Sequence, residues 1–159
     1  MVRLSRRSRV AVGVAAAGIV VAGAMVIREV SSPTFDVEPA AKGGAPECTR
    51  IAKEYPDRLN GQERDHTDLP GVAAWGGGAV VLRCGLTPPR PTTDACVNVD
   101  DVDWVLREAK SQDGRKLLIT YGRHPAVEAT VSGQGSGIDT LLVELSKTVK
   151  PIRQHEHCL

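Results

Sequence analysis

The chain has 159 residues and a formal net charge of +1, from 20 basic and 19 acidic residues. Five basic residues lie at or before Arg28 and every acidic residue lies from Glu29 onward, which leaves 15 basic against 19 acidic residues, a net charge of −4. This balance argues against a nucleic-acid partner, because binding to nucleic acid needs a concentrated basic patch. The roughly 130 residues after Arg28 are enough for one domain with a modest core.

The first recognisable element is an uncharged apolar segment, residues 10–27. As a helix rising about 1.5 Å per residue it would cover roughly 27 Å, close to the hydrocarbon core of a bilayer. Four arginines lie within residues 1–9, and basic residues stay preferentially on the cytoplasmic side. The sequence therefore predicts one N-terminal transmembrane helix, a single pass through the cell membrane with residues 1–9 inside and the rest outside.

The same segment also contains Ala22-Gly23-Ala24, a small-x-small pattern that suits signal-peptide cleavage. Cleavage there would give a secreted protein, and the periodicity of the segment does not decide between the two outcomes. In both, the chain beyond the segment lies outside the cytosol. Residues 28–45 are rich in Ser, Pro, Ala and Gly without an apolar period, which predicts a flexible linker.

Four cysteines lie in the part of the chain that follows: Cys48, Cys84, Cys96 and Cys158. An even number of cysteines outside the cytosol indicates disulfides, and four allow three pairings. We favour Cys84–Cys96, which would close a short proline-rich loop, with Cys48–Cys158 joining the two ends of the domain. Zinc is the rival interpretation, but the sequence has no C-x-x-C or H-x3-5-H spacing, so we predict neither a metal nor another cofactor.

Pro46 is expected to begin a short helix that Pro56 stops. Its apolar face would hold Cys48, Ile51, Ala52 and Tyr55. Strands are predicted where apolar and polar residues alternate, over residues 79–84, 102–107, 116–121 and 127–131. Asp113-Gly114 is a hairpin turn signal, and an apolar stripe from Ile138 to Val149 predicts a C-terminal helix.

These elements predict an α+β domain over residues 46–159. A four-stranded, largely antiparallel sheet is covered on one face by the C-terminal helix, with the short N-terminal helix beside it. Antiparallel pairing is favoured because the connections are too short for parallel crossovers. Neither glycine run (76–78 or 133–137) has the sequence context of a phosphate-binding loop.

Several short motifs resemble those of one family, domain of unknown function 3515. They are Ala74-Trp75-Gly76, Val81-Leu82-Arg83-Cys84-Gly85, Val102-Asp103-Trp104, Thr120-Tyr121-Gly122-Arg123-His124-Pro125 and the closing Cys158-Leu159. The resemblance covers roughly residues 46–159, and Gly77-Gly78 departs from it. It implies a small actinobacterial membrane-anchored or secreted protein of the cell envelope. It brings no activity and no established site residues.

The layout of anchor, linker and domain favours a non-catalytic domain that binds an unknown envelope protein or ligand. Arg83 and Arg123 are the candidate ligand-binding residues, because each closes a strand and arginine forks suit carboxylate or phosphate groups. The alternative is a secreted envelope enzyme, a hydrolase or a metal-assisted one. It would use His66 or His124 with nearby carboxylates such as Asp65 or Asp68. No catalytic residue is assigned.

Overall fold

The computed structural model describes residues 35, 37–133 and 137–158. The chain divides after Ser31 into two units, and every described residue belongs to the second unit. The predicted membrane segment, residues 10–27, lies outside the described residues. Within the described part of the chain, no helix has both the length and the apolar character needed to cross a membrane.

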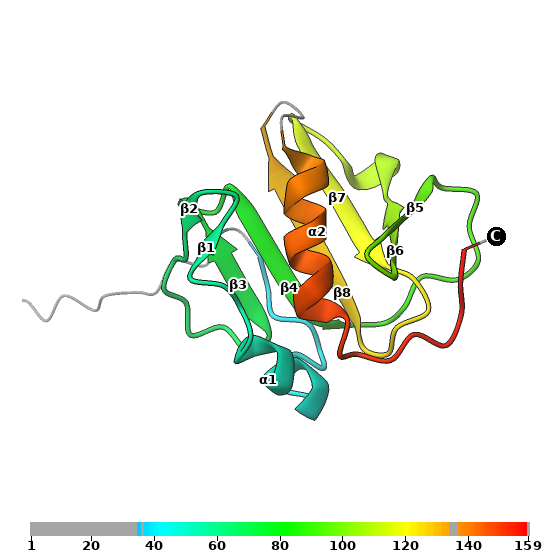
Figure 1. Cartoon of the computed structure of the whole chain (residues 1–159), viewed down its shortest axis with the longest axis horizontal. Helices are drawn as coiled ribbons and strands as arrows, with labels where there is room; N and C mark the ends of the chain where they lie inside the picture. The colour runs from blue at the N-terminus through cyan, green and yellow to red at the C-terminus, as the bar shows by residue number, and fades with distance from the viewer. Residues whose placement is uncertain (1–34, 36, 134–136, 159) are drawn as a thin grey trace, which may run out of the picture. The chain divides into compact units, whose positions relative to one another are not determined.

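An antiparallel sheet forms the centre of the domain (Figure 1). Its strands are β3 (Val72–Trp75), β4 (Val80–Leu86), β5 (Cys96–Val99), β6 (Val102–Leu106), β7 (Arg115–Thr120) and β8 (Ala126–Ser132), in the spatial order β3-β4-β8-β7-β6-β5. Each neighbouring pair is antiparallel. A separate two-stranded hairpin joins β1 (Arg58–Leu59) to β2 (Gln62–Glu63), and the helices are α1 (Pro46–Ala52), the 3-10 turn η1 (Glu108–Lys110) and α2 (Ile138–Val149).

The predicted α+β class, the antiparallel sheet and the C-terminal helix are confirmed, but the predicted strand number of four is wrong. The sheet has six strands because β3 and β5 also belong to it. Every residue of β3 is buried, since both faces of this strand are covered, and its sequence therefore lacks the alternation that reveals a half-buried strand. The two central residues of β5 are exposed, so its sequence shows no apolar face either.

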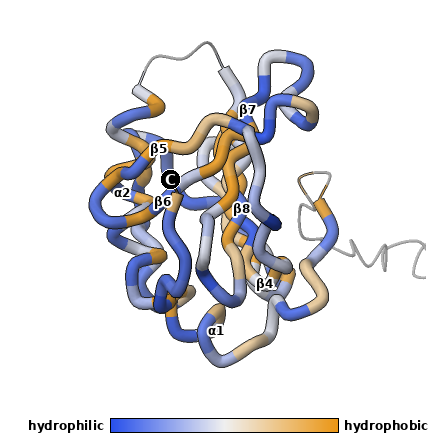
Figure 2. The backbone as a smooth tube through the Cα atoms, turned by 90° about the vertical axis from the view of Figure 1, so that its right-hand side faces the viewer, coloured by the Kyte–Doolittle hydropathy of each residue, from blue (hydrophilic) through white to orange (hydrophobic). Residues whose placement is uncertain are grey.

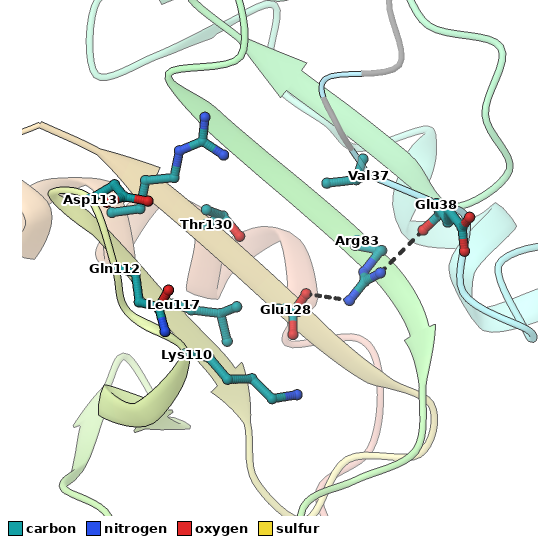
Figure 3. A pocket seen from close by; sticks show the side chains of 10 residues that line it. Val37, Glu38, Arg83, Lys110, Gln112, Asp113, Leu117, Glu128 and Thr130 are labelled. Atoms are coloured by element: carbon teal, nitrogen blue, oxygen red, sulfur yellow. Dashed lines mark hydrogen bonds and ion pairs between the residues drawn. The ribbon is translucent and has the colours of Figure 1, made fainter.

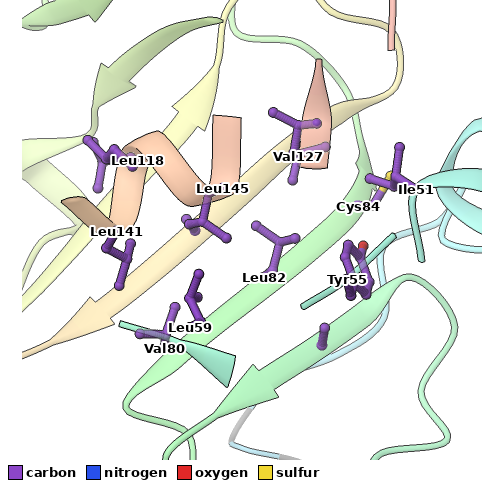
Figure 4. Close-up of a cluster of buried hydrophobic side chains, with 14 of the residues drawn as sticks. Ile51, Tyr55, Leu59, Val80, Leu82, Cys84, Leu118, Val127, Leu141 and Leu145 are labelled. Atoms are coloured by element: carbon purple, nitrogen blue, oxygen red, sulfur yellow. The ribbon is translucent and has the colours of Figure 1, made fainter. Parts of the chain in front are cut away.

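Helix α2 covers one face of the sheet (Figures 1 and 4). Of the two α-helices, it contributes more apolar side chains to the core. Leu141, Leu145 and Val149 of α2 are at most 2% exposed. They pack with alternate residues of the central strands, among them Leu82, Leu118 and Val127. Figure 2 shows hydrophobic positions on β8 and mostly hydrophilic ones on the surrounding loops. Along β8, Val127 and Ala129 face the core and alternate with the polar Glu128 and Thr130.

A buried hydrogen bond fixes the helix on the sheet. The indole Nε1 of Trp104, a fully buried side chain of β6, donates to the Ser146 hydroxyl of α2 over 2.9 Å. Burial of so large a ring contributes strongly to stability, and the hydrogen bond satisfies its one polar atom. Trp75 of β3 is satisfied in the same way, through the Pro56 carbonyl at 2.9 Å.

The favoured disulfide pairing is wrong: the bonds are Cys48–Cys84 and Cys96–Cys158. Cys84 lies on β4 and Cys96 on β5, which are separated in the sheet by β8, β7 and β6. Four strand spacings amount to roughly 19 Å, far beyond the reach of a disulfide. Cys84 instead meets Cys48 of α1 in the core under α2, and Cys96 meets Cys158 of the C-terminal tail in a different cluster.

The part of the expected linker that the structure describes after Asp36, Val37–Ala45, lies against the sheet, and we call it the strap. The backbone N–H group of Lys42 in the strap donates a hydrogen bond to the Gly85 carbonyl over 3.2 Å. Gly85 sits in a β-bulge of β4 with φ +108°, and a Cβ there would overlap the backbone of the strap. The glycine therefore allows a close backbone approach that fixes where the strap crosses the sheet.

Candidate functional site

A groove of about 620 Å³ lies on the sheet face opposite α2 (Figure 3). Arg83 of β4, Glu128 of β8 and Leu117 of β7 contribute to its floor, because they alternate with the residues that face the helix. The strap forms one wall through Val37 and Glu38. The segment before β7 forms another. The charged residues that line this sheet groove are Glu38, Arg83, Lys110, Asp113, Arg115 and Glu128.

An ion pair lies in the floor of the sheet groove. The Arg83 Nη2 atom donates to Glu128 Oε1 over 2.6 Å, and the pair joins directly opposed residues of β4 and β8. The Glu128 side chain is 8% exposed and that of Arg83 is 26% exposed. Arg83 Nη1 also donates to the Glu38 carbonyl of the strap over 3.2 Å. The arginine is thus held from two sides while part of its side chain stays open to solvent.

Other polar side chains of the groove have no partner within the described residues. No hydrogen bond or ion pair joins the side chains of Lys110, Gln112, Arg115 or Thr130 to another residue that the structure describes. Ammonium and guanidinium groups in this state are available to carboxylate or phosphate oxygens. The groove can therefore contact a polar ligand without first breaking an internal ion pair at these positions.

The second candidate, Arg123, lies elsewhere and is only 3% exposed. Its guanidinium donates to the carbonyls of Asp101, at 2.8 Å, Lys150, at 3.1 Å, and Ile152. Burial lowers the pKa of the Arg123 guanidinium from its ordinary value, although the negative charges of Asp103 and Asp101 oppose this. The structure does not bring Arg123 into the sheet groove with Arg83, and its donors hold the segment that follows α2.

Asp103 of β6 is a buried carboxylate that was not among the predicted site residues. It holds the end of the C-terminal tail, residues 154–158. It is 4% exposed and accepts hydrogen bonds from Asn98, Gln154 and the Cys158 N–H group at 2.6–2.9 Å. His157 Nδ1 lies 3.4 Å from it. Burial alone would raise the pKa of the Asp103 carboxyl, but the donated hydrogen bonds and the nearby His157 outweigh it and lower the pKa.

A signal for this role was present in the sequence. Asp103 stands between Val102 and Trp104 in a strand whose other residues are apolar, and an acidic residue in such a strand is expected to have buried partners. Asn98 lies only five residues away, but the partners in the tail, Gln154 and Cys158, lie more than fifty residues away, so the sequence could not name them. The tail reaches them by crossing Gly122, where a Cβ would overlap the Glu156 backbone.

The structure places His66 beside one of its candidate carboxylates, Asp68, but places His124 in another part of the domain. His66 is exposed and lies 3.6 Å from Asp68, whereas the Asp65 carboxylate accepts the N–H groups of Gly77 and Gly78 at 3.1 and 3.0 Å. His124 lines a different groove with His155 and Glu156. In the described part of the chain, no three His, Cys, Asp or Glu side chains are placed to hold a metal ion.

Comparison with known families gives one match. Neither the curated proteins nor the solved structures contain a match to the chain. The sequence matches the family model described as "Protein of unknown function (DUF3515)" over residues 9–157, which is nearly the whole chain. The chain therefore belongs to the DUF3515 family.

Proposed function

We propose that the chain is a non-catalytic binding protein of the cell envelope, anchored to the membrane by residues 10–27, whose folded domain contacts an anionic group of an envelope protein or ligand. The observation that carries the proposal is the sheet groove, where Arg83, Lys110 and Arg115 line a polar hollow of about 620 Å³. Ligand sites have volumes of this order, and a few placed charges give them their specificity. Of the two candidate arginines, Arg83 is the one proposed to contact the ligand. Arg123 donates hydrogen bonds to the segment that follows α2.

Two further observations support the proposal. Both pairs of cysteines form disulfides, which persist in oxidising surroundings outside the cytosol. Lys110 ends η1 and Arg115 begins β7, and the short loop between them also lines the groove through Gln112 and Asp113. Binding residues are often carried on loops beside a rigid sheet.

The test is crosslinking in intact cells with a photoreactive amino acid at Gln112, a residue that lines the groove. We expect one specific adduct, reduced at least fivefold by Lys110→Glu with Arg115→Glu, because charge reversal repels an anionic group. A photoreactive residue at the exposed Lys53 serves as the matched control and should give no such adduct. Absence of an adduct from Gln112, or an adduct that the charge reversal leaves unchanged, would contradict the proposal.

A further inference from the structure

The Glu128 carboxylate is the most unusual group in the sheet groove. Its side chain is only 8% exposed. Among the described residues, Arg83 donates a hydrogen bond to its Oε1 atom. The Oε2 atom accepts none from the described residues and keeps contact with solvent in the groove. A carboxylate oxygen that is open to the groove can accept a hydrogen bond from a ligand that brings an N–H group or an ammonium.

Basic groups line the same groove. Lys110 and Arg115 have no ion-pair partner within the described residues, and Figure 3 shows Glu128 between Arg83 and Lys110. The groove thus offers an acceptor for a cation next to donors for an anion. The described residues of its lining include three acidic and three basic side chains, so it complements a ligand with both charges better than a ligand with one.

The rest of the lining narrows the class of ligand. None of the described residues that line the groove is aromatic, so these residues offer no ring on which a base or a sugar could stack. Among the same described residues, only Val37 and Leu117 have apolar side chains, which is too little surface for an acyl chain. Gln112 and Thr130 can hydrogen-bond with backbone amides.

We infer that the sheet groove binds a peptide segment that carries both an ammonium and a carboxylate. The ammonium contacts Glu128 Oε2, and the carboxylate contacts Lys110 and Arg115. This inference rests on the proposed function, since it names the ligand class of the same groove, and it makes Glu128 a specificity-determining residue.

The test measures dissociation constants of three short peptides by NMR titration of the full chain in detergent micelles. The probes are acetyl-Glu-Ala-Lys-amide, its acidic analogue with norleucine in place of lysine, and its basic analogue with glutamine in place of glutamate. We expect the peptide with both charges to bind about tenfold more tightly than either analogue, since a hydrogen bond to a charged group is typically worth that factor.

The variants separate the two halves of the contact. Glu128→Gln should remove the preference for the lysine-containing peptide and leave binding of the acidic analogue unchanged, whereas Lys110→Gln should weaken both. Lys53→Gln, at an exposed position away from the groove, is the matched control. Because Glu128→Gln also removes the negative charge that is paired with Arg83, Arg83→Gln with Glu128→Gln is measured too, and it should likewise abolish the preference.

The outcomes distinguish this inference from the proposal beneath it. Equal affinity for the acidic analogue and the doubly charged peptide would overturn the inference and leave an anion-binding groove. Tighter binding of glycerophosphoethanolamine than of the peptide would overturn the peptide assignment in favour of a lipid headgroup. If no probe shifts the groove resonances while the crosslink from Gln112 also fails, the proposed function falls together with the inference.

Discussion

At the scale of single residues, the most consequential buried charge is Asp103. Its carboxylate accepts hydrogen bonds from a neighbouring strand and from the tail that ends in Cys158. Protonation would weaken these bonds and put a neutral acid beside His157. Because the acceptor is almost completely buried, we expect Asp103 to couple the stability of the folded domain to pH.

The sign of this coupling follows from the lowered pKa of Asp103. The unfolded chain takes up the proton first, near the ordinary Asp pKa of about 3.9, so the contribution is fully present above that pH. It is lost as the pH falls from there through the lower pKa of the folded state. We predict that Asp103→Asn lowers the unfolding free energy at pH 7 by about 2 kcal/mol and reduces its decrease on acidification, measured by urea unfolding from pH 7 to pH 2.

The matched control is Asp57→Asn, an exposed aspartate whose side chain makes no hydrogen bond with the described residues. It should leave both the stability and its pH dependence close to those of the unaltered chain. A pH profile of Asp103→Asn that superimposes on that of the unaltered chain would show that Asp103 does not carry the coupling.

Arg83 and Arg123 show why candidate site residues are hard to rank from sequence. The sequence predicts that each closes a strand and offers the same argument for both, but this placement is wrong: Arg83 lies in the middle of β4, and Arg123 lies three residues after the end of β7. Their partners come from distant segments, the strap for Arg83 and the tail for Arg123. Only the tertiary contacts reveal that one guanidinium lines a groove and the other is enclosed.

Among the structural elements, the crossing of the tail over Gly122 fixes how the C-terminus is held. Gly122 has φ +66°, and a Cβ would overlap the backbone of Glu156. We predict that Gly122→Ala destabilises the domain by about 3 kcal/mol, because it combines an unfavourable φ with displacement of the tail. Urea unfolding measures the loss, and hydrogen exchange of residues 151–158 should increase.

Gly77→Ala is the matched control for this prediction. Gly77 has nearly the same φ, +67°, but a Cβ there would have no heavy atom within 4 Å. Gly77→Ala should lower the unfolding free energy by only about 1 kcal/mol, which is the cost of the unfavourable φ alone. Equal losses for the two variants would mean that the tail contact contributes nothing measurable.

Elements with a clear period were predictable, and those without one were not. The alternation in β4, β6, β7 and β8 marks strands with one face in the core, and the stripe of α2 marks a helix on that face. β3 is buried throughout, and β1 and β2 have two residues each, so neither case leaves a readable pattern. α1 ends at Ala52 and not at Pro56, which reflects the usual uncertainty of helix ends.

For the molecule as a whole, the disulfide pairing depends on strand order and not on separation along the chain. Cys84 and Cys96 are consecutive among the four cysteines of the chain. A hairpin between their two strands would have brought them together. The segment between them instead passes from β4 to the far edge of the sheet, where β5 pairs with β6. Strand order is a long-range property, so the sequence could indicate that the four cysteines are oxidised without indicating the partners.

The two disulfides make the folded domain dependent on an oxidising compartment. They close loops with sequence separations of 36 and 62 residues. In the chain-entropy model each contributes about 4 kcal/mol, and their sum of about 8 kcal/mol is comparable to the whole unfolding free energy of a typical domain, about 5–15 kcal/mol. We predict that Cys48→Ser with Cys84→Ser, or Cys96→Ser with Cys158→Ser, lowers the unfolding free energy by about 4 kcal/mol, and that complete reduction unfolds most of the protein at 37 °C.

Urea unfolding of the two double variants measures each contribution separately. Peptide mapping without reductant should recover Cys48 with Cys84 and Cys96 with Cys158. Thiol trapping in intact cells should label none of the four sulfur atoms before reduction, because the proposed envelope location keeps them oxidised. Free thiols in the native chain, or a reduced protein as stable as the oxidised one, would contradict both this energetic argument and the location inferred from it.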